Sequence, residues 1–347
     1  MPARPKQQHF VTRAYLERFL DPDCERLFCY GRQRNAPFQS KPEQLARQRN
    51  YYSVPQADGS FDDSLEHRLE QVEVPGLEVI RKLAMGRTRL SLPERRSLAL
   101  LMGVQRSRVP QVRNLVDSTY SEVTSTLLKW HDKQASEGPG QMSLRRVPAY
   151  GSTAPIEGSE ITVNRDEMKA ALSSLDQDPE EFSRNGILRL AIRFAEIFLV
   201  MKWTVFYADS QTPFICSDCP VLFRYEGTDI AMGGIARPDT IIEFPLSRTS
   251  LLSLTHDIPL ITRLNALGPR SSEAQAILKR TPEIRIVRAD QAQVREFNLN
   301  QALYCSRWTY AGRENEWLLS ALRAPSKSIR HRLTWDGKLI RVEATPG

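Results

Sequence analysis

Two periodicities divide this chain, and their order limits the folds that it can adopt. Before residue 201, apolar residues recur mostly at helical spacing, as in Leu65, Leu69 and Val72. From residue 202 onward, short β-rich runs cluster instead, beginning with residues 203–207. Helices followed by clustered strands are typical of α+β proteins and not of alternating α/β proteins. We therefore expect an α+β fold with a helical N-terminal half and a mostly antiparallel sheet in the C-terminal half.

The same patterns predict how the chain is organised. We expect a single α+β domain over residues 1–320, with its helical part at about 1–201 and its β-rich part at about 202–310. Residues 134–160 are rich in Gly, Pro and Ser, which favours a mobile insertion over a regular element. Residues 321–347 are expected to form a C-terminal extension.

Local signals predict several individual elements. Ser91 and Glu94 have the spacing of a capping box, which starts a helix that runs towards Arg108. Pro75 should kink or break the helix that begins near Ser64. The other expected strands are residues 26–30, 203–207, 214–216, 221–223, 240–244, 251–254 and 284–287. The other expected helices are residues 41–47, 164–174, 179–201, 291–304 and one after Pro110 that reaches about residue 131.

Positive charge is concentrated in the first third of the chain. Residues 1–113 contain 20 Lys and Arg against 13 Asp and Glu, which accounts for the whole formal net charge of +7. Aromatic residues are interleaved with this charge, a combination typical of nucleic-acid surfaces that pair with phosphates and stack on bases. A solvated Arg-rich surface over an aromatic core explains the same composition. Nucleic acid is the expected partner, with an ordinary basic surface as the alternative.

No targeting segment is expected. Residues 1–10 lack the apolar core of a signal peptide. The most apolar run, residues 191–208, is interrupted by Arg193, Glu196 and Lys202, so we expect neither a membrane span nor a membrane partner. Five cysteines in 347 residues do not suggest a disulfide framework. The expected location is cytoplasmic.

Residues 6–19 join a basic, polar lead to a short amphipathic helix. The lead contains Lys6 and His9, and the helix carries Tyr15 and Phe19 on one face. Burial of such side chains stabilises the docked segment by about 1.5–3 kcal/mol each. A His held beside Arg and Lys should have a lowered pKa, because like charges disfavour the imidazolium form. His9 is therefore a candidate base or metal ligand, or alternatively a residue that fixes the chain through a backbone hydrogen bond.

Three glutamates share a face of the helix expected to begin near Ser64. Helical spacing brings Glu66, Glu70 and Glu73 together on that face. Neighbouring carboxylates repel one another unless a cation offsets them, which fits a divalent metal such as Mg²⁺ or Mn²⁺. Arg108 is the other candidate cation, and its guanidinium also suits a phosphate or carboxylate ligand. A solvated helix face is the simplest alternative.

Cys216 and Cys219 form a Cys-x-x-Cys pair, but no second pair completes a zinc site. Asp218 lies between them at the end of an expected strand, where catalytic and metal-binding carboxylates are common. The alternative is an Asx turn that shapes the hairpin around Pro220. Asp218 is thus a further candidate carboxylate, and the two cysteines are expected to be incidental.

Segments over about residues 6–310 resemble the DUF4238 family of uncharacterised proteins. The family opening reads Lys-x-His-[Phe/Tyr]-Val-Pro-x-x-Tyr-Leu-x-x-Phe, and this chain matches it at His9, Tyr15 and Phe19. Two departures are Thr12 in place of the proline and Lys6 one residue further from the histidine. The other positions that the resemblance marks are Glu66, Glu73, Arg108, Asp218 and Asn298. The family name implies a set of residues and no reaction.

These observations predict an enzyme that acts on nucleic acid or another phosphate-bearing substrate, as a divalent-metal-dependent, nuclease-like hydrolase. The predicted catalytic residues are His9, Glu66, Glu73 and Asp218, and the predicted substrate-binding residues are Lys6, Tyr15, Arg108 and Asn298. The alternative is a non-catalytic module that docks nucleic acid or an acidic protein through its basic N-terminal third. Convergence of these side chains in one cleft favours the enzyme, whereas scatter favours the binding module.

Overall fold

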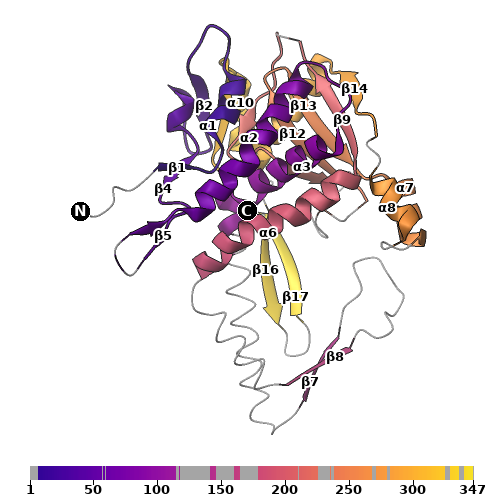
Figure 1. Ribbon diagram of the computed structural model, residues 1–347. Helices are drawn as coiled ribbons and strands as arrows, with labels where there is room; N and C mark the ends of the chain where they lie inside the picture. The colour runs from indigo at the N-terminus through magenta and orange to yellow at the C-terminus, as the bar shows by residue number, and fades with distance from the viewer. Residues whose placement is uncertain are drawn as a thin grey trace.

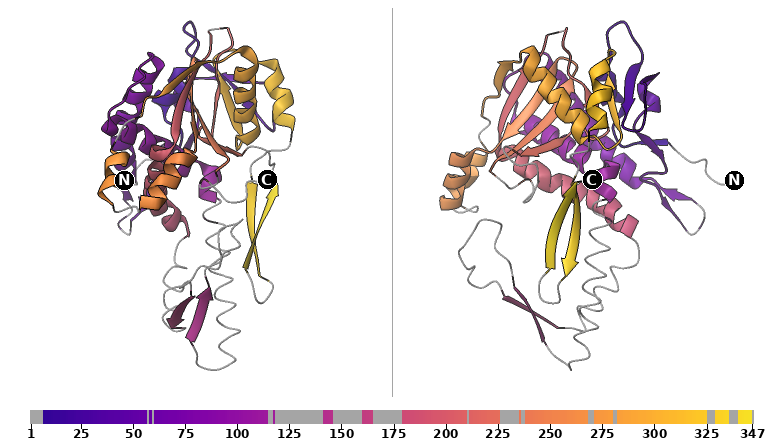
Figure 2. Two further views of the ribbon diagram at one scale, coloured as in Figure 1. Left: turned by 90° about the vertical axis from the view of Figure 1, so that its right-hand side faces the viewer. Right: turned by 180° about the vertical axis from the view of Figure 1, so that it is seen from behind.

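The computed structural model describes residues 7–56, 58, 60–114, 117, 141–145, 160–164, 179–209, 211–225, 235, 238–267, 271–279, 282–324, 329–335 and 340–346. Its centre is a sheet between two layers of helices (Figures 1 and 2). Helices α2 (Ser64–Ala84) and α3 (Leu92–Ser107) cover one face, and α9 (Gln291–Tyr304) lies on the other.

The larger sheet has five strands, all from the C-terminal half of the chain, in the order β11-β12-β13-β9-β14. Neighbouring strands are antiparallel except for β14 and β9, which are parallel. The α+β class is confirmed, and this sheet has the antiparallel character that the sequence predicts. Its strands are β9 (Lys202–Tyr207), β11 (Leu222–Tyr225), β12 (Thr240–Ser247), β13 (Ser250–Thr255) and β14 (Arg285–Arg288).

A second sheet combines strands from both halves of the chain, in the order β10-β15-β2-β3. Its strands are β2 (Leu27–Gly31), β3 (Phe38–Ser40), β10 (Cys216–Ser217) and β15 (Trp308–Ala311). Two short antiparallel pairs, β1 (Gln7–His9) with β4 (Arg47–Arg49) and β5 (Val54–Pro55) with β6 (Phe61–Asp62), also lie in the N-terminal half. The prediction of a helical N-terminal half is therefore correct only in part, because its short segments pair with strands that arrive from far along the chain.

Helix α3 packs against both α2 and α6 (Pro179–Val200), and α6 lies below α2 and α3 in Figure 1. Ser91 caps α3 and forms the predicted capping box with Glu94. Gly103 lets α3 approach α6 closely, since a Cβ there would clash with the backbone carbonyl of Ala191. The close contact fixes α3, and therefore Arg108, the C-cap residue that follows it, relative to the rest of the core.

Of the two outcomes expected at Pro75, a kink or a break, the break does not occur, because α2 runs from Ser64 to Ala84 with Pro75 inside it. A proline removes one intrahelical hydrogen bond, a loss that the tertiary packing of a helix can offset. Gly76 beside it is buried, and a Cβ there would lie 2.5 Å from Leu101 Cβ of α3. The close α2–α3 contact therefore holds the helix together at its weakest point.

The N-terminal segment docks on the core as predicted. Helix α1 (Arg13–Leu16) continues into the 3₁₀ turn η1 (Glu17–Phe19), and Tyr15 and Phe19 are fully buried. The Tyr15 hydroxyl donates to the Pro245 carbonyl at 2.7 Å, and its ring stacks on Phe244 with centroids 5.3 Å apart. These contacts attach the N-terminal segment to β12 and hold His9 in a defined position.

The remaining described elements lie outside the two sheets and the helices named above. They are η2 (Pro42–Gln44), α7 (Ile258–Leu267), α8 (Ser272–Leu278), α10 (Glu316–Arg323) and the hairpins β7–β8 (Gln141–Arg145, Glu160–Asn164) and β16–β17 (Ile329–Trp335, Ile340–Pro346). The predicted helix at 41–47 is only the short turn η2, which β4 follows. The predicted mobile insertion contains β7, and the predicted helix at 164–174 lies largely outside the described residues. Within the described ranges, none of the helices is both long and apolar enough to cross a membrane.

Candidate functional site

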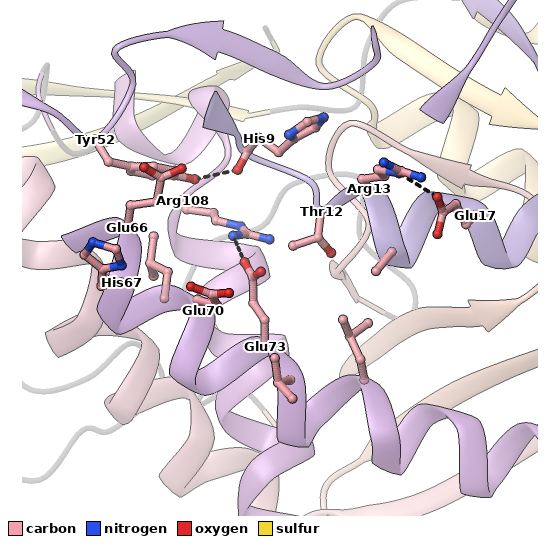
Figure 3. A pocket seen from close by; sticks show the side chains of 14 residues that line it. His9, Thr12, Arg13, Glu17, Tyr52, Glu66, His67, Glu70, Glu73 and Arg108 are labelled. Carbon is pink, nitrogen blue, oxygen red and sulfur yellow. Dashed lines mark hydrogen bonds and ion pairs between the residues drawn. The ribbon is translucent and has the colours of Figure 1, made fainter. Parts of the chain in front are cut away.

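A pocket of about 580 Å³ opens between the N-terminal segment and α2. His9 and Thr12 line it from β1 and the turn that follows, and Arg108 lines it from the end of α3. Glu66 and Glu73 face it from α2. Figure 3 shows the Arg108 guanidinium at the centre of the labelled side chains. Four residues of the predicted set thus converge, although they are as far apart in sequence as the first strand and the third helix.

Arg108 is a buried charge with an incomplete set of partners. Its side chain is 1% exposed, and its Nη1 donates to Glu73 Oε1, the ion pair drawn in Figure 3. Nε donates to Gln105 Oε1 at 3.3 Å, but Nη2 is buried without a partner. Burial lowers the pKa of Arg108, yet Glu73 and Tyr52 raise it by more, so the guanidinium stays charged. Among the described residues, one amino group of this buried guanidinium therefore has no hydrogen-bond partner.

His9 has a free ring nitrogen in the same pocket. Its Nε2 is buried without a partner, while the ring hydrogen-bonds the backbone of Glu43. Burial lowers the pKa of His9 below its ordinary value, the Glu43 contact opposes this effect, and Arg47 and Arg108 add to the lowering. The predicted direction is confirmed, but burial and not like charge is the largest cause. The ring is neutral at pH 7 and can accept a proton.

Thr12 supplies a third buried polar atom that has no hydrogen-bond partner among the described residues. This residue stands in place of the proline of the family-like opening, and its Oγ1 is buried without a partner. Buried polar atoms in folded proteins nearly always have a hydrogen-bond partner from protein or ordered water. His9 Nε2, Thr12 Oγ1 and Arg108 Nη2 all belong to residues that line one pocket, and none has a partner among the described residues.

Gln8 is a residue of this region that sequence reasoning missed. It is 1% exposed, and its Nε2 donates to Ser53 Oγ at 2.9 Å and to Glu66 Oε2 at 3.0 Å. Its Oε1 accepts from the backbone N–H of Tyr52 at 2.6 Å. Gln8 therefore ties β1 to the start of α2 and fixes Glu66. Strand alternation around His9, which places neighbours on opposite faces, is the signal that predicts a buried position here.

Asp218 lies elsewhere, at the end of β10, and lines a different pocket from His9 and Arg108. Its Oδ1 accepts from the Ser306 N–H at 2.8 Å, and its Oδ2 accepts from Arg307 at 2.7 Å and Trp308 at 2.9 Å. Burial raises the pKa of Asp218 to about 6, although these backbone N–H groups oppose the rise. The carboxylate fastens the turn after β10 to the residues that lead into β15.

Three other residues of the predicted set lie outside the pocket or outside the described chain. Tyr15 is buried in the core, where its hydroxyl donates a hydrogen bond to the Pro245 carbonyl. Asn298 accepts from the Ile215 N–H at 3.0 Å and donates to the Pro213 carbonyl at 2.9 Å, next to the strand that carries Asp218. Lys6 precedes the first described residue. The set is thus partly convergent and partly dispersed.

The carboxylates of the pocket do not fit a divalent metal. Among the described residues, no three His, Cys, Asp or Glu side chains gather closely enough to hold an ion. Glu66 already accepts from Gln8, and Glu73 is paired with Arg108. All five cysteines are free thiols, with Cys216 and Cys219 buried. We therefore assign no step at this site to Mg²⁺, Mn²⁺ or Zn²⁺.

Fold and pocket together define an α+β protein with a polar site between its N-terminal segment and its first long helix. The family model described as "Protein of unknown function (DUF4238)" matches residues 7–315. The chain belongs to the DUF4238 family, as its opening and its Arg108 segment suggest. No curated protein and no solved structure matches it.

Proposed function

We propose that the pocket beside Arg108 binds and hydrolyses a phosphate-bearing substrate, with His9 as the general base. The observation that carries this proposal is the trio of unpartnered polar atoms, His9 Nε2, Thr12 Oγ1 and Arg108 Nη2, on residues that line one pocket. A guanidinium and a hydroxyl suit the non-bridging oxygens of a phosphate. A neutral imidazole beside them suits the activation of water.

The charge of the pocket favours a singly charged phosphodiester over a doubly charged monoester. More carboxylates than guanidinium groups line it: Glu17, Glu66, Glu70 and Glu73 against Arg13 and Arg108. Arg13 is paired with Glu17 at 2.6 Å, and Arg108 with Glu73. The remaining negative charge repels a dianion more strongly than a monoanion. Diesters of this kind form the backbone of nucleic acids, so a nuclease-like activity fits best.

The chemistry requires only groups of this chain and one water. His9 Nε2 accepts a proton from the water as its oxygen attacks phosphorus. Arg108 Nη2 and the Thr12 hydroxyl donate to the non-bridging oxygens, where negative charge accumulates in the transition state. The bond from phosphorus to the leaving oxygen then breaks, and the proton held by His9 passes to that oxygen. Glu73 keeps the guanidinium oriented through its ion pair.

A comparison of two chromogenic substrates tests this proposal. The diester bis(p-nitrophenyl) phosphate and the monoester p-nitrophenyl phosphate are supplied separately to the full chain in EDTA, and again with Mg²⁺ or Mn²⁺. We expect hydrolysis of the diester in EDTA, faster than that of the monoester, and its loss by about 100-fold or more in His9→Ala. His67→Ala is the matched control, because His67 lines the same pocket but is exposed. Activity that requires added metal, or that survives His9→Ala, contradicts the proposed mechanism.

A second candidate function rests on a different surface. Around the pocket that Asp218 lines, the Arg307 guanidinium lies 5.1 Å from the Trp308 ring centroid, and Arg34 lies 4.8 Å from that of Phe38. Exposed arginines with partly buried rings suit a single nucleic-acid strand, through phosphate pairing and base stacking. This surface supports a non-catalytic module that docks nucleic acid.

Anisotropy of a labelled single-stranded oligonucleotide, titrated at several salt concentrations, tests the second candidate. Affinity should fall with salt by a log–log slope of roughly −0.7 for each phosphate neutralised. Arg307→Ala should weaken binding and reduce the salt slope by about 0.7, the value for one phosphate contact. The backbone N–H of residue 307 remains available to Asp218 in this variant. Binding that is unaffected by salt and by Arg307→Ala removes this candidate.

A further inference from the structure

A second cavity, remote from Arg108, lies between the start of α3, the α6–β9 junction and helices α7 and α8. Its volume is about 860 Å³, which is within the range of small-molecule sites. Apolar side chains form part of its wall, among them Leu199, Met201 and Leu260. Leu278 of α8 also lines it and is 37% exposed, although it is a large apolar residue. In Figure 1, helices α7 and α8 lie at the lower right of the larger sheet.

Arg95 is the unusual residue of this cavity. It lines the cavity and is 2% exposed, which makes it one of the largest fully buried side chains of the described chain. Its Nη1 donates to the Pro282 carbonyl at 3.0 Å, and its guanidinium carbon lies 4.3 Å from the centroid of a Trp203 ring. Its Nη2 is buried without a partner.

None of the acids around the cavity neutralises Arg95 within the described residues. Three acidic residues line it, and each has a different cation: Asp257 with Lys202 at 3.4 Å, Glu283 with Arg89 at 3.6 Å and Glu196 with Arg193 at 3.1 Å. Burial alone lowers the pKa of Arg95 to about 10, and no neighbouring carboxylate raises it. The guanidinium is therefore still charged at pH 7 and has no counter-ion in the part of the chain that the structure describes.

A buried charge without a counter-ion opposes folding, and proteins nearly always pair such groups. Arg108 shows the usual arrangement in this same chain, since Glu73 neutralises it. The Trp203 face offsets only part of the Arg95 charge, because a cation–π contact is weaker than an ion pair.

We propose that this cavity binds an organic monocarboxylate with an apolar body, whose carboxylate pairs with Arg95 and whose body lies against Leu199, Met201 and Leu260. The unpartnered Nη2 of buried Arg95 suits a carboxylate, and the apolar side chains that form part of the wall suit an apolar body. The site is separate from the pocket beside Arg108 and does not depend on the function proposed for it.

Three probes of different chemistry test the assignment by calorimetric titration of the full chain. Decanoate carries both the charge and the apolar body, decanol lacks the charge, and inorganic phosphate lacks the apolar body. We expect decanoate to bind at one site, with decanol and phosphate weaker by about tenfold or more, since a charge-assisted hydrogen bond is lost or the apolar contact is absent. Decanol that binds as well as decanoate, or phosphate that binds more tightly, overturns the proposal.

Arg95→Met and Arg96→Met form a matched pair of variants. Both residues line the cavity from the same helix, but Arg95 is buried and Arg96 is exposed. Arg95→Met should weaken decanoate binding by about tenfold or more without lowering the thermal midpoint of the ligand-free protein, because it removes an unpaired buried charge. Arg96→Met should change decanoate affinity by less than about threefold, as expected for a solvated charge. Equal effects of the two variants contradict the role given to Arg95.

A third variant keeps the test decisive if Arg95→Met does not fold. Leu278 is partly exposed on α8, so Leu278→Glu should fold while it places a negative charge at the cavity wall. Decanoate binding should then fall by about tenfold or more, because the new carboxylate repels the ligand. Unchanged decanoate affinity in Leu278→Glu shows that the ligand binds elsewhere and overturns the proposal.

Discussion

Arg108 and Asp218 are both buried ionisable residues at family-like positions, yet their surroundings differ in one decisive respect. Both oxygens of Asp218 are occupied, since three backbone N–H groups donate to them at 2.7–2.9 Å. Arg108 is equally buried, but one of its two amino groups has no partner. A buried charge with complete partners holds the chain together, whereas an unpartnered donor on a residue that lines a pocket is consistent with the ligand site proposed above.

The neighbours of the two residues support this distinction. Near Asp218, Ser217 Oγ donates to Gln301 Oε1 at 2.8 Å, and Gln301 Nε2 donates to the Pro220 carbonyl at 3.2 Å. These bonds join the β10 turn to α9, and Asn298 adds two more. Near Arg108, the free atoms of His9 and Thr12 lack such partners. We infer that the family-like positions divide into a structural group around Asp218 and a ligand-binding group around Arg108.

The largest expected effect tests the structural side of this comparison. Asp218→Ala leaves three buried N–H groups without an acceptor, so the free energy of unfolding should fall by about 3–5 kcal/mol. Chemical denaturation monitored by circular dichroism measures this loss. Asp209→Ala is the matched control, because Asp209 also accepts from two backbone N–H groups but is exposed, and it should cost about 1 kcal/mol or less.

Asp218→Asn sharpens the same test without a change of shape. An amide places a donor against the Arg307 and Trp308 N–H groups or the Ser306 N–H, so it cannot accept all three bonds. A clear loss of stability is expected here as well. If Asp218→Ala or Asp218→Asn has normal stability but does not hydrolyse the diester, Asp218 has a functional role and not a structural one.

The next effect tests the ion pair of the pocket. Glu73→Gln removes the negative partner of a fully buried guanidinium, so the free energy of unfolding should fall by about 3 kcal/mol. Added sulfate should restore part of this stability, because an anion that enters the pocket can replace the lost charge. Thermal unfolding with and without sulfate measures both effects.

Glu70→Gln provides the control for Glu73→Gln. Glu70 lies on the same helix and lines the same pocket, but it is exposed, so a change within about 0.5 kcal/mol is expected. If sulfate stabilises the wild type, Glu73→Gln and Glu70→Gln equally, the anion does not act at Arg108. The inference that the residues around Arg108 bind a ligand then fails.

Local sequence signals predict much of the fold. The last predicted helix, residues 291–304, coincides with α9, and the Ser91–Glu94 capping box starts α3 as expected. Every predicted strand between residues 203 and 287 overlaps a described strand, although residues 214–216 share only Cys216 with β10. These elements depend on periodicity, caps and turn residues that lie within a few positions of one another.

The site depends on contacts that no local signal contains. Gln8 meets Ser53 and Glu66 across 45 and 58 residues, and Arg108 meets Glu73 across 35. The sequence offers pairing of Arg108 with Glu66 or Glu73 as an alternative to ligand binding, but only the packing of α2 against α3 selects Glu73. The turn that carries Asp218 meets its partners across 88–90 residues, so its structural role is visible only after folding.

The smallest expected effect on stability belongs to His9. The ring is half-buried and its Nε2 has no partner, so His9→Ala should change the free energy of unfolding by less than about 1 kcal/mol at pH 7.5. Because burial lowers the folded-state pKa below the ordinary 6.5, the unfolded chain binds the proton more tightly. Wild-type stability should therefore decline as pH falls below 6.5, and His9→Ala should decline less. Denaturation at pH 7.5 and pH 5 measures this difference.

His67→Ala separates this linkage from a general response to acid, because His67 lines the same pocket but is exposed. It should retain the wild-type dependence of stability on pH. Hydrolysis of the diester should lose rate on an acid limb that lies below pH 6.5, since the base must be neutral and its pKa is lowered. If His9→Ala instead unfolds the protein at pH 7.5, the backbone contact with Glu43 is the main role of His9, and the pocket resembles the Asp218 turn in being structural.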